Sequence, residues 1–282
     1  MTYTVVAWDR PGNSIGLGTV SHSAAVLTKV LVHRQDAEVE VLVASQAFSS
    51  SALGSAAALK TLAGADPQKI GAFCAASEGG SFRQVVLVSS RGTLAAYTGA
   101  GCLTYAGDRV DSEAGVAIGG NMLVDRGVLE AAYDAFRAAP GPLDARILAA
   151  LDAAGSAGGD FRGDRSAGLV IRDQDGPGLD VRVDDHDRPH TELRRLRDLA
   201  HKRAGLADCY AWAARGCRAA EAAVLATRLL PDSDDLDIAA WLWAVTTHGR
   251  LTPAVVSAEA EALGTELLTR LVDRPAERAS NR

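Results

Sequence analysis

Residues 1–23, MTYTVVAWDRPGNSIGLGTVSHS, contain the clearest structural pattern in the chain. Apolar and polar residues alternate as far as Asp9, a Pro-Gly-Asn turn follows at 11–13, and a second alternating run leads into Ser21. Alternation with a period of two on both sides of a turn is typical of a β-hairpin. The sequence therefore predicts two antiparallel strands at the start of the chain.

The residue after the initiator methionine gives this hairpin a possible chemical role. We expect Met1 to be removed, because threonine at position 2 is small. Thr2 would then carry a hydroxyl nucleophile and a free α-amine that serves as its base, a known catalytic arrangement. The reference pKa of an α-amine, about 7.7 to 8.0, suits a base near neutral pH. The alternatives are that Met1 stays, or that Thr2 only begins an edge strand.

The composition favours a folded protein that binds neither nucleic acid nor membranes. The 282 residues are enough for one large domain, or for a medium domain with an appendage, and 48% of them are hydrophobic. The net charge of -6, spread along the chain, leaves no basic surface for nucleic acid. The sequence lacks an apolar run of roughly 18 to 20 residues, a signal-peptide pattern and metal-ligand spacing of its cysteines. We expect a cytoplasmic protein with reduced thiols.

Blocks of predicted strands and blocks of predicted helices follow the hairpin. Strand patterns cover 38–44, 115–120, 166–172 and 179–183, with a further hairpin between 82 and 98. Helical patterns cover 50–63, 123–139 and 142–154, and the pair Asp66-Pro67 begins another helix. This blockwise order favours an α+β domain with antiparallel sheets over a strictly alternating parallel sheet.

The pattern changes to helix alone from His190 onward. Helical spacing continues through 193–199, 204–215, 218–230, 234–247 and 252–271. We place a boundary near residue 200, with an α+β domain at 1–200 and a helical C-terminal domain at 201–282. Trp212, Trp241 and Trp243 would supply much of the helical core. We expect this helical segment to mediate assembly, as a homo-oligomer or with a protein partner.

An ordered series of short motifs resembles a known family. They are Ser45-Gln46, Arg83-Gln84-Val85, Gly120-Asn121-Met122-Leu123, 158–163 (GGDFRG) and 182–186 (RVDDH), after the opening strand. Over roughly residues 1 to 200, the series is similar to the domain-of-unknown-function 1028 family. The resemblance implies a four-layer αββα sandwich of the N-terminal-nucleophile (Ntn) hydrolase-like kind. Positions 21–26 and 49–51 depart from the family pattern, so a substrate preference does not carry over.

The candidate catalytic residues are Thr2, Ser21, Asn121 and Asp160. Ser21 ends the second strand beside the start of the first, where it would orient the nucleophile or bind substrate, whereas we expect its neighbour His22 to be structural. Asn121 would donate its amide to an oxyanion or a substrate, or would only be a turn residue. Asp160 would pair with the N-terminal ammonium or with an arginine, or would lie in a solvated loop.

The candidate substrate-binding residues are Gln46, Arg83 and Arg162. Arg83 would bind a substrate carboxylate in bidentate fashion, although a partly exposed arginine at a strand end is the common alternative. Arg162 shares the glycine-rich loop with Asp160, and the two would form an ion pair.

A cluster of acidic residues and histidines follows the last predicted strand. It consists of Asp184, Asp185, His186, Asp187 and His190. Carboxylates and imidazoles suit a divalent cation, but consecutive strand residues point to opposite faces and cannot converge on one ion. Helix capping and charge at the start of the following helix explain Asp187 and Thr191. We therefore expect no metal and no cofactor.

These observations lead to one main hypothesis and one alternative. The main hypothesis is a cytoplasmic Ntn-type amidohydrolase or peptidase, with Thr2 as nucleophile, that cleaves an amide of a small molecule or peptide. The alternative is a non-catalytic scaffold or binding protein whose helical tail mediates assembly.

Overall fold

The computed structural model describes residues 2–173 and 178–214. The chain divides into two compact units, Met1–Arg197 and Asp198–Arg282. The predicted helices at 218–230, 234–247 and 252–271, with Trp241 and Trp243, lie outside the described residues, as does the side chain of Trp212. The boundary at residue 200 and the assembly role of the tail stay predictions.

The N-terminal hairpin forms as predicted. Strands β1 (Thr2–Asp9) and β2 (Ser14–Ser21) pair antiparallel, with Thr2 opposite Ser21 and Asp9 opposite Ser14. Asn13 closes the turn with a φ of 45°, a left-handed conformation that asparagine tolerates better than most residues.

The hairpin lies inside a larger antiparallel sheet. Among the described residues this sheet has six strands in the order β10-β9-β2-β1-β8-β7. The additional strands are β7 (Gly107–Asp111), β8 (Val116–Asn121), β9 (Ser166–Asp173) and β10 (Leu179–Val183). Strand β1 is central, because β2 pairs with one of its edges and β8 with the other. Both edges of the strand that begins with Thr2 are therefore hydrogen-bonded to neighbouring strands.

A smaller antiparallel sheet has the order β3-β4-β5-β6. Its strands are β3 (Leu31–Gln35), β4 (Glu40–Ala47), β5 (Arg83–Ser89) and β6 (Leu94–Thr98), and the one-turn helix α1 (Val26–Val30) leads into it. The predicted hairpin between 82 and 98 is formed by β5 and β6. Gly92 in its turn has a φ of 84°, which glycine adopts without strain.

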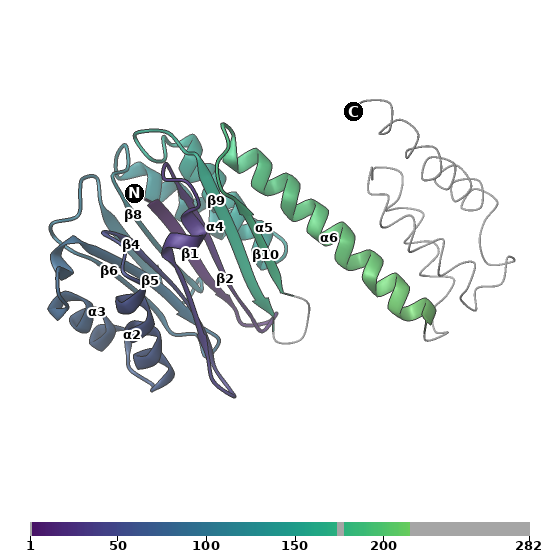
Figure 1. Ribbon diagram of the computed structural model, residues 1–282, viewed down its shortest axis with the longest axis horizontal. Coiled ribbons are helices and arrows are strands. Elements are labelled where there is room, and N and C mark those ends of the chain that lie inside the picture. The colour runs from purple at the N-terminus through teal and green to yellow at the C-terminus, as the bar shows by residue number, and fades with distance from the viewer. Residues whose placement is uncertain (1, 174–177, 215–282) are drawn as a thin grey trace, which may run out of the picture. The chain divides into compact units, whose positions relative to one another are not determined.

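Two pairs of helices pack on the sheets. Helices α2 (Ser51–Leu62) and α3 (Pro67–Ala76) contact the smaller sheet, and α4 (Gly127–Ala138) and α5 (Leu143–Ser156) contact the larger one (Figure 1). The Ser50 and Asp66 side chains cap α2 and α3, as the Asp-Pro pair predicted for the latter. A short 3₁₀ helix, η1 (Gly80–Phe82), precedes β5.

Two predicted helix boundaries were wrong. Helix α4 begins at Gly127 rather than at 123, because the backbone of Leu123 exchanges hydrogen bonds with that of Tyr105. The predicted helices at 193–199 and 204–215 are one continuous helix, α6 (Pro189–Ala214), since no proline or glycine interrupts 200–203. None of the helices in the described part of the chain is both long enough and apolar enough to cross a bilayer.

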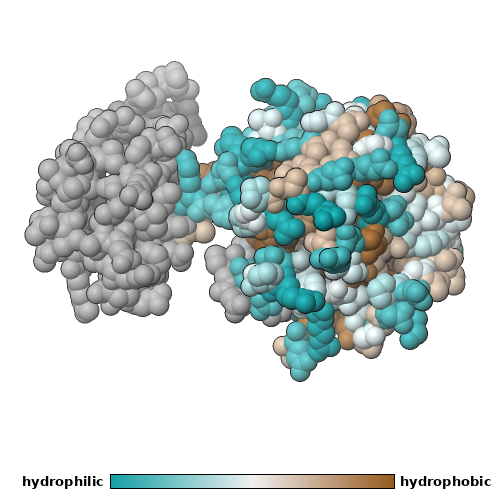
Figure 2. Space-filling model, turned by 180° about the vertical axis from the view of Figure 1, so that it is seen from behind, coloured by the Kyte–Doolittle hydropathy of each residue, from teal (hydrophilic) through white to brown (hydrophobic). Residues whose placement is uncertain are grey.

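The two sheets face each other across an apolar core. Val6 and Leu17 of the larger sheet meet Leu42, Val86 and Val88 of the smaller one there. A second core lies between the smaller sheet and α2 and α3. On the face drawn in Figure 2, hydrophilic residues predominate and hydrophobic ones lie dispersed among them, as on most folded domains. The described chain is thus a mixed α/β structure with antiparallel sheets, as predicted at that level.

Candidate active site

Thr2 begins the central strand of the larger sheet, between two of the other predicted site residues. It is paired with Ser21 on β2 and with Asn121 on β8. Strand alternation places its side chain on the same face as Val6, which belongs to the core between the sheets. The Thr2 hydroxyl donates to Ser21 Oγ at 3.3 Å. With Met1 present, Thr2 is only 3% exposed.

A buried polar cluster lies beside Thr2, at one end of the space between the sheets. Its members are each at most 1% exposed: Thr4, Thr19, Ser21, Gln46, Gln84 and Asn121. Thr4 Oγ1 donates to Gln46 Oε1 at 2.6 Å and lies 2.8 Å from Thr19 Oγ1. Buried polar groups are costly unless they are hydrogen-bonded, so this mutual pairing allows the cluster to be buried.

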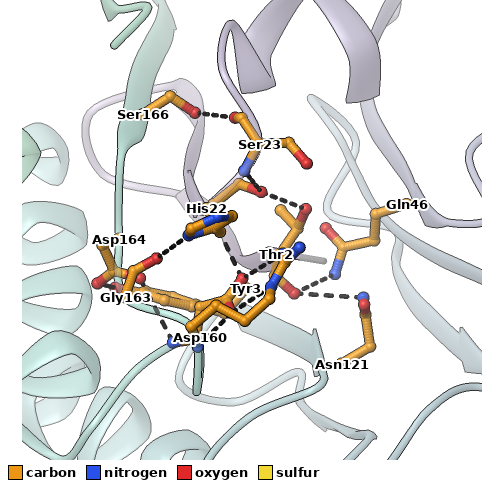
Figure 3. A network of polar contacts seen from close by, with 12 residues as sticks. Thr2, Tyr3, His22, Ser23, Gln46, Asn121, Asp160, Gly163, Asp164 and Ser166 are labelled. Carbon is orange, nitrogen blue, oxygen red and sulfur yellow. Dashed lines mark hydrogen bonds and ion pairs between the residues drawn. The ribbon is translucent and has the colours of Figure 1, made fainter. Parts of the chain in front are cut away.

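Two amide side chains hold the backbone of Thr2. The Gln46 and Asn121 side chains point toward the Thr2 carbonyl and donate to it at 3.4 and 3.3 Å (Figure 3). Both amides also donate to Gln84 Oε1, at 2.7 and 2.9 Å. These hydrogen bonds hold the backbone at the start of β1 in place. They also mean that both amide groups already have acceptors inside the protein.

The glycine-rich loop brings the Asp160 carboxylate to the end of β2. Asp160 accepts from Arg162 Nε and from a terminal nitrogen of the same guanidinium, at 3.1 and 3.0 Å, and from the His22 backbone N–H at 3.3 Å. Asp160 is 1% exposed. Three glycines in the loop, Gly158, Gly159 and Gly163, adopt positive φ angles. Of the two ion pairs considered for Asp160, the structure contains the one with Arg162.

His22 lies at the same end of β2. Its Nδ1 is 2.9 Å from the Gly163 carbonyl oxygen, and the side chain lies beside the loop in Figure 3. This contact ties the end of the hairpin to the loop and agrees with the structural role expected for His22.

Tyr3 anchors the opposite face of β1. Its hydroxyl donates to Asp164 Oδ2 at 2.6 Å and lies 3.0 Å from His190 Nε2. Burial, and then the Asp164 carboxylate, raise the pKa of the Tyr3 hydroxyl well above its usual value. The residue next to Thr2 is therefore attached to both the loop and the start of α6.

Arg83 lies apart from Thr2. It precedes Gln84 in β5, and strand alternation places its side chain on the other face of the sheet from Gln84. A terminal guanidinium nitrogen of Arg83 donates to the carbonyl oxygens of Phe48 and Ser49, and the guanidinium lies 4.6 Å from the centroid of the Phe48 ring. Binding of a substrate carboxylate by Arg83 stays a prediction.

The acidic cluster after β10 is paired with arginines. Arg165 bonds to both Asp185 and Asp187, and Arg182 bonds to Asp184. Within residues 2–173 and 178–214, no three His, Cys, Asp or Glu side chains are grouped so that they could hold a metal ion.

A pocket of about 460 Å³ adjoins the Thr2 contacts. Its lining comes from the ends of β4, η1 and β8 and from the loop between β6 and β7. It consists of Ala47, Phe48, Phe82, Gly101, Cys102, Leu103, Asn121 and Met122. Asn121 belongs both to this lining and to the residues that hold Thr2. Asn121 therefore connects the pocket to the Thr2 backbone.

Sequence reasoning missed Gln84 and Tyr3. Gln84 precedes Val86 and Val88 on the same face of its strand, and this alternation was a usable signal that its side chain points inward. Tyr3 meets Asp164 and His190 over more than 160 residues of chain, and no local pattern indicates that contact.

The comparisons with known proteins agree with this fold. DUF1028, a family of unknown function, matches residues 2–193, and the chain belongs to this family. The crystal structure of protein SPO2555 from Silicibacter pomeroyi, described by the same family, is similar to it with a TM-score of 0.65 and 29% sequence identity. That match covers 72% of this chain and 89% of the other. No curated protein matches the chain.

Proposed function

We propose that the chain is an Ntn-type amidohydrolase or peptidase of the αββα class, in which Thr2 becomes the N-terminal nucleophile after removal of Met1. The observation that carries the proposal is the position of Thr2. It begins the central strand, its hydroxyl bonds to Ser21, and two buried amides hold its carbonyl beside a pocket. Two facing sheets with helices packed on each support the fold class.

The proposed reaction uses the two functional groups of Thr2. The hydroxyl oxygen attacks the carbonyl carbon of the amide, and the hydroxyl proton passes to the Thr2 α-amine. The C–N bond then breaks as this proton passes to the departing amine. An ester on Thr2 remains, and water hydrolyses it to release a carboxylic acid and restore the hydroxyl.

The neighbouring residues act by positioning in this scheme. Ser21 accepts the hydrogen bond of the Thr2 hydroxyl and orients it. Asn121 and Gln46 fix the Thr2 backbone rather than binding the substrate, because their amides are engaged within the protein. The Asp160–Arg162 pair shapes the loop that closes the end of β2.

A substitution series with a panel of simple amides tests the proposal. Thr2→Ala should abolish turnover, and Thr2→Ser should retain part of it, because serine also offers a hydroxyl and an α-amine. Thr191→Ala is the matched control, since Thr191 is exposed at the start of α6. Turnover that survives Thr2→Ala would exclude Thr2 as the nucleophile.

A second candidate function is ligand binding without catalysis. It is favoured by the low exposure of Thr2, which is 3% exposed with Met1 present, and by the bonds of the Asn121 amide, the predicted oxyanion donor, to Thr2 and Gln84. In that case the pocket binds a small molecule or peptide, and the C-terminal segment provides the assembly surface. Ligand binding with no turnover in any Met1-free preparation is the result expected of this candidate. A solution mass that is constant over a wide concentration range would exclude self-association.

A further inference from the structure

The pocket beside Thr2 has an apolar lining. None of its eight lining residues carries a charged side chain. Phe48, Phe82 and Leu103 are 68%, 56% and 63% exposed, so three large apolar side chains surround one hollow. Apolar groups that gather in this way at a surface mark a binding site more often than a chance arrangement.

The backbone around the pocket is held in an unusual conformation. Ala47 and Met122 have φ angles of 64° and 51°, a region that residues with a Cβ rarely adopt. Both residues line the pocket. Strain of this kind costs free energy and tends to occur at ligand-binding sites. Ala47 ends β4, the strand that carries Gln46, and Met122 directly follows β8, the strand that carries Asn121.

Arg83 supports one wall of this pocket. Its guanidinium stacks on the Phe48 ring and donates to the Phe48 and Ser49 carbonyls. These contacts hold the backbone that positions Phe48. Arg83 is not among the residues that line the pocket.

We infer that this pocket binds the uncharged, apolar acyl group of an amide. The inference rests on the proposed function, because it places the acyl side of the scissile bond in the pocket and the carbonyl next to Thr2. The volume of about 460 Å³ falls within the usual range for small-molecule sites. An acyl group that ends in a carboxylate should bind more weakly, because none of the residues that line the pocket carries a positive charge to pair with it.

Binding to the Thr2→Ala variant of the full chain tests the assignment without requiring turnover. The probes are the 4-nitroanilides of hexanoic acid and of succinic acid, which differ in the end of the acyl chain. Isothermal titration should show at least tenfold tighter binding of the hexanoyl compound. Added to this variant, Leu103→Ala should weaken that binding about tenfold or more, because apolar contacts in a pocket are lost. Leu59→Ala is the matched control, since Leu59 is 58% exposed on α2 and does not line the pocket.

The outcomes separate this assignment from the proposed hydrolysis. Selective hexanoyl binding supports the assignment, even if the Met1-free wild-type chain hydrolyses neither compound, a result that would count only against hydrolysis. Turnover with equal affinity for both probes overturns the assignment and leaves hydrolysis intact. Preferential binding of the succinyl compound overturns it as well. A further outcome is that neither probe binds and that the chain self-associates in a way that Leu103→Asp abolishes. That result would assign the pocket to a second copy of the chain and would also overturn the acyl-binding assignment.

Discussion

Gln84 is the central connection of the polar cluster, and its removal should be costly. Its side-chain amide donates to Thr98 Oγ1, to the Gly107 carbonyl and to the Gly120 carbonyl, at 2.8, 3.0 and 2.9 Å. Its Oε1 accepts from Gln46 and Asn121. Gln84 is 0% exposed, so water cannot replace these partners. Gln84→Leu keeps a similar side-chain volume but removes all of these bonds.

The expected loss follows from the groups left without partners. The Gln46 amide keeps the Thr2 and Gly119 carbonyls as acceptors for its two hydrogens. One hydrogen of the Asn121 amide loses its acceptor, and the Gly107 carbonyl, on the edge strand β7, loses its Gln84 donor. With two such groups unsatisfied, at about 1 to 3 kcal/mol each, the unfolding free energy should fall by roughly 2 to 6 kcal/mol. Urea unfolding followed by circular dichroism measures this difference. Gln68→Leu on the exposed surface of α3 is the control and should change stability by at most about 0.5 kcal/mol. A loss below about 1 kcal/mol for Gln84→Leu would refute the assigned network.

Three further predictions concern the surroundings of the site. Burial raises the pKa of the Tyr3 hydroxyl in the folded protein above its usual value of 10.0. The contribution of Tyr3 to stability is therefore complete below pH 10 and is lost as the pH rises further. The loss of stability with rising alkaline pH should be less steep in Tyr3→Phe. Iodoacetamide at pH 8 should leave Cys74 unmodified in the folded protein, because burial raises the pKa of its thiol to about 11, whereas the half-buried Cys102 should react slowly. Mass spectrometry of peptides identifies the modified thiols. Rapid labelling of Cys74 would contradict its buried position. Gly16→Ala should cost about 1 to 3 kcal/mol in urea unfolding, because its Cβ would lie 2.5 Å from Ile147 Cδ1, and Ile147→Val should reduce that cost in the double variant.

Local pattern was sufficient to predict the elements with clear alternation or clear caps. The first hairpin and the start of α3 at Asp66-Pro67 are of this kind. Strand β7 was not predicted, because it is polar and lies at the edge of its sheet, where no buried face imposes alternation. Strand β3 was hidden because it directly follows the apolar one-turn helix α1, so the two form a single apolar run in the sequence.

The candidate site was only partly accessible from sequence. The end-to-end pairing of β1 and β2 placed Ser21 beside Thr2, and that contact is present. The adjacent pair Arg83-Gln84 shows the limit of sequence reasoning. The arginine attracts attention as a charge, yet Gln84 is the residue that faces the interior. Deciding between them requires knowing which face of the sheet meets the second sheet, and that depends on pairing between distant strands.

The most direct test of the central claim is a mass measurement on the purified chain after treatment with a β-lactone, which acylates an activated hydroxyl without releasing a leaving group. If Thr2 is the nucleophile, the chain should be lighter by one methionine residue and should carry one lactone. The lactone should lie on the N-terminal peptide and should be absent in Thr2→Ala. Retention of Met1, or acylation at any residue other than Thr2, would contradict it.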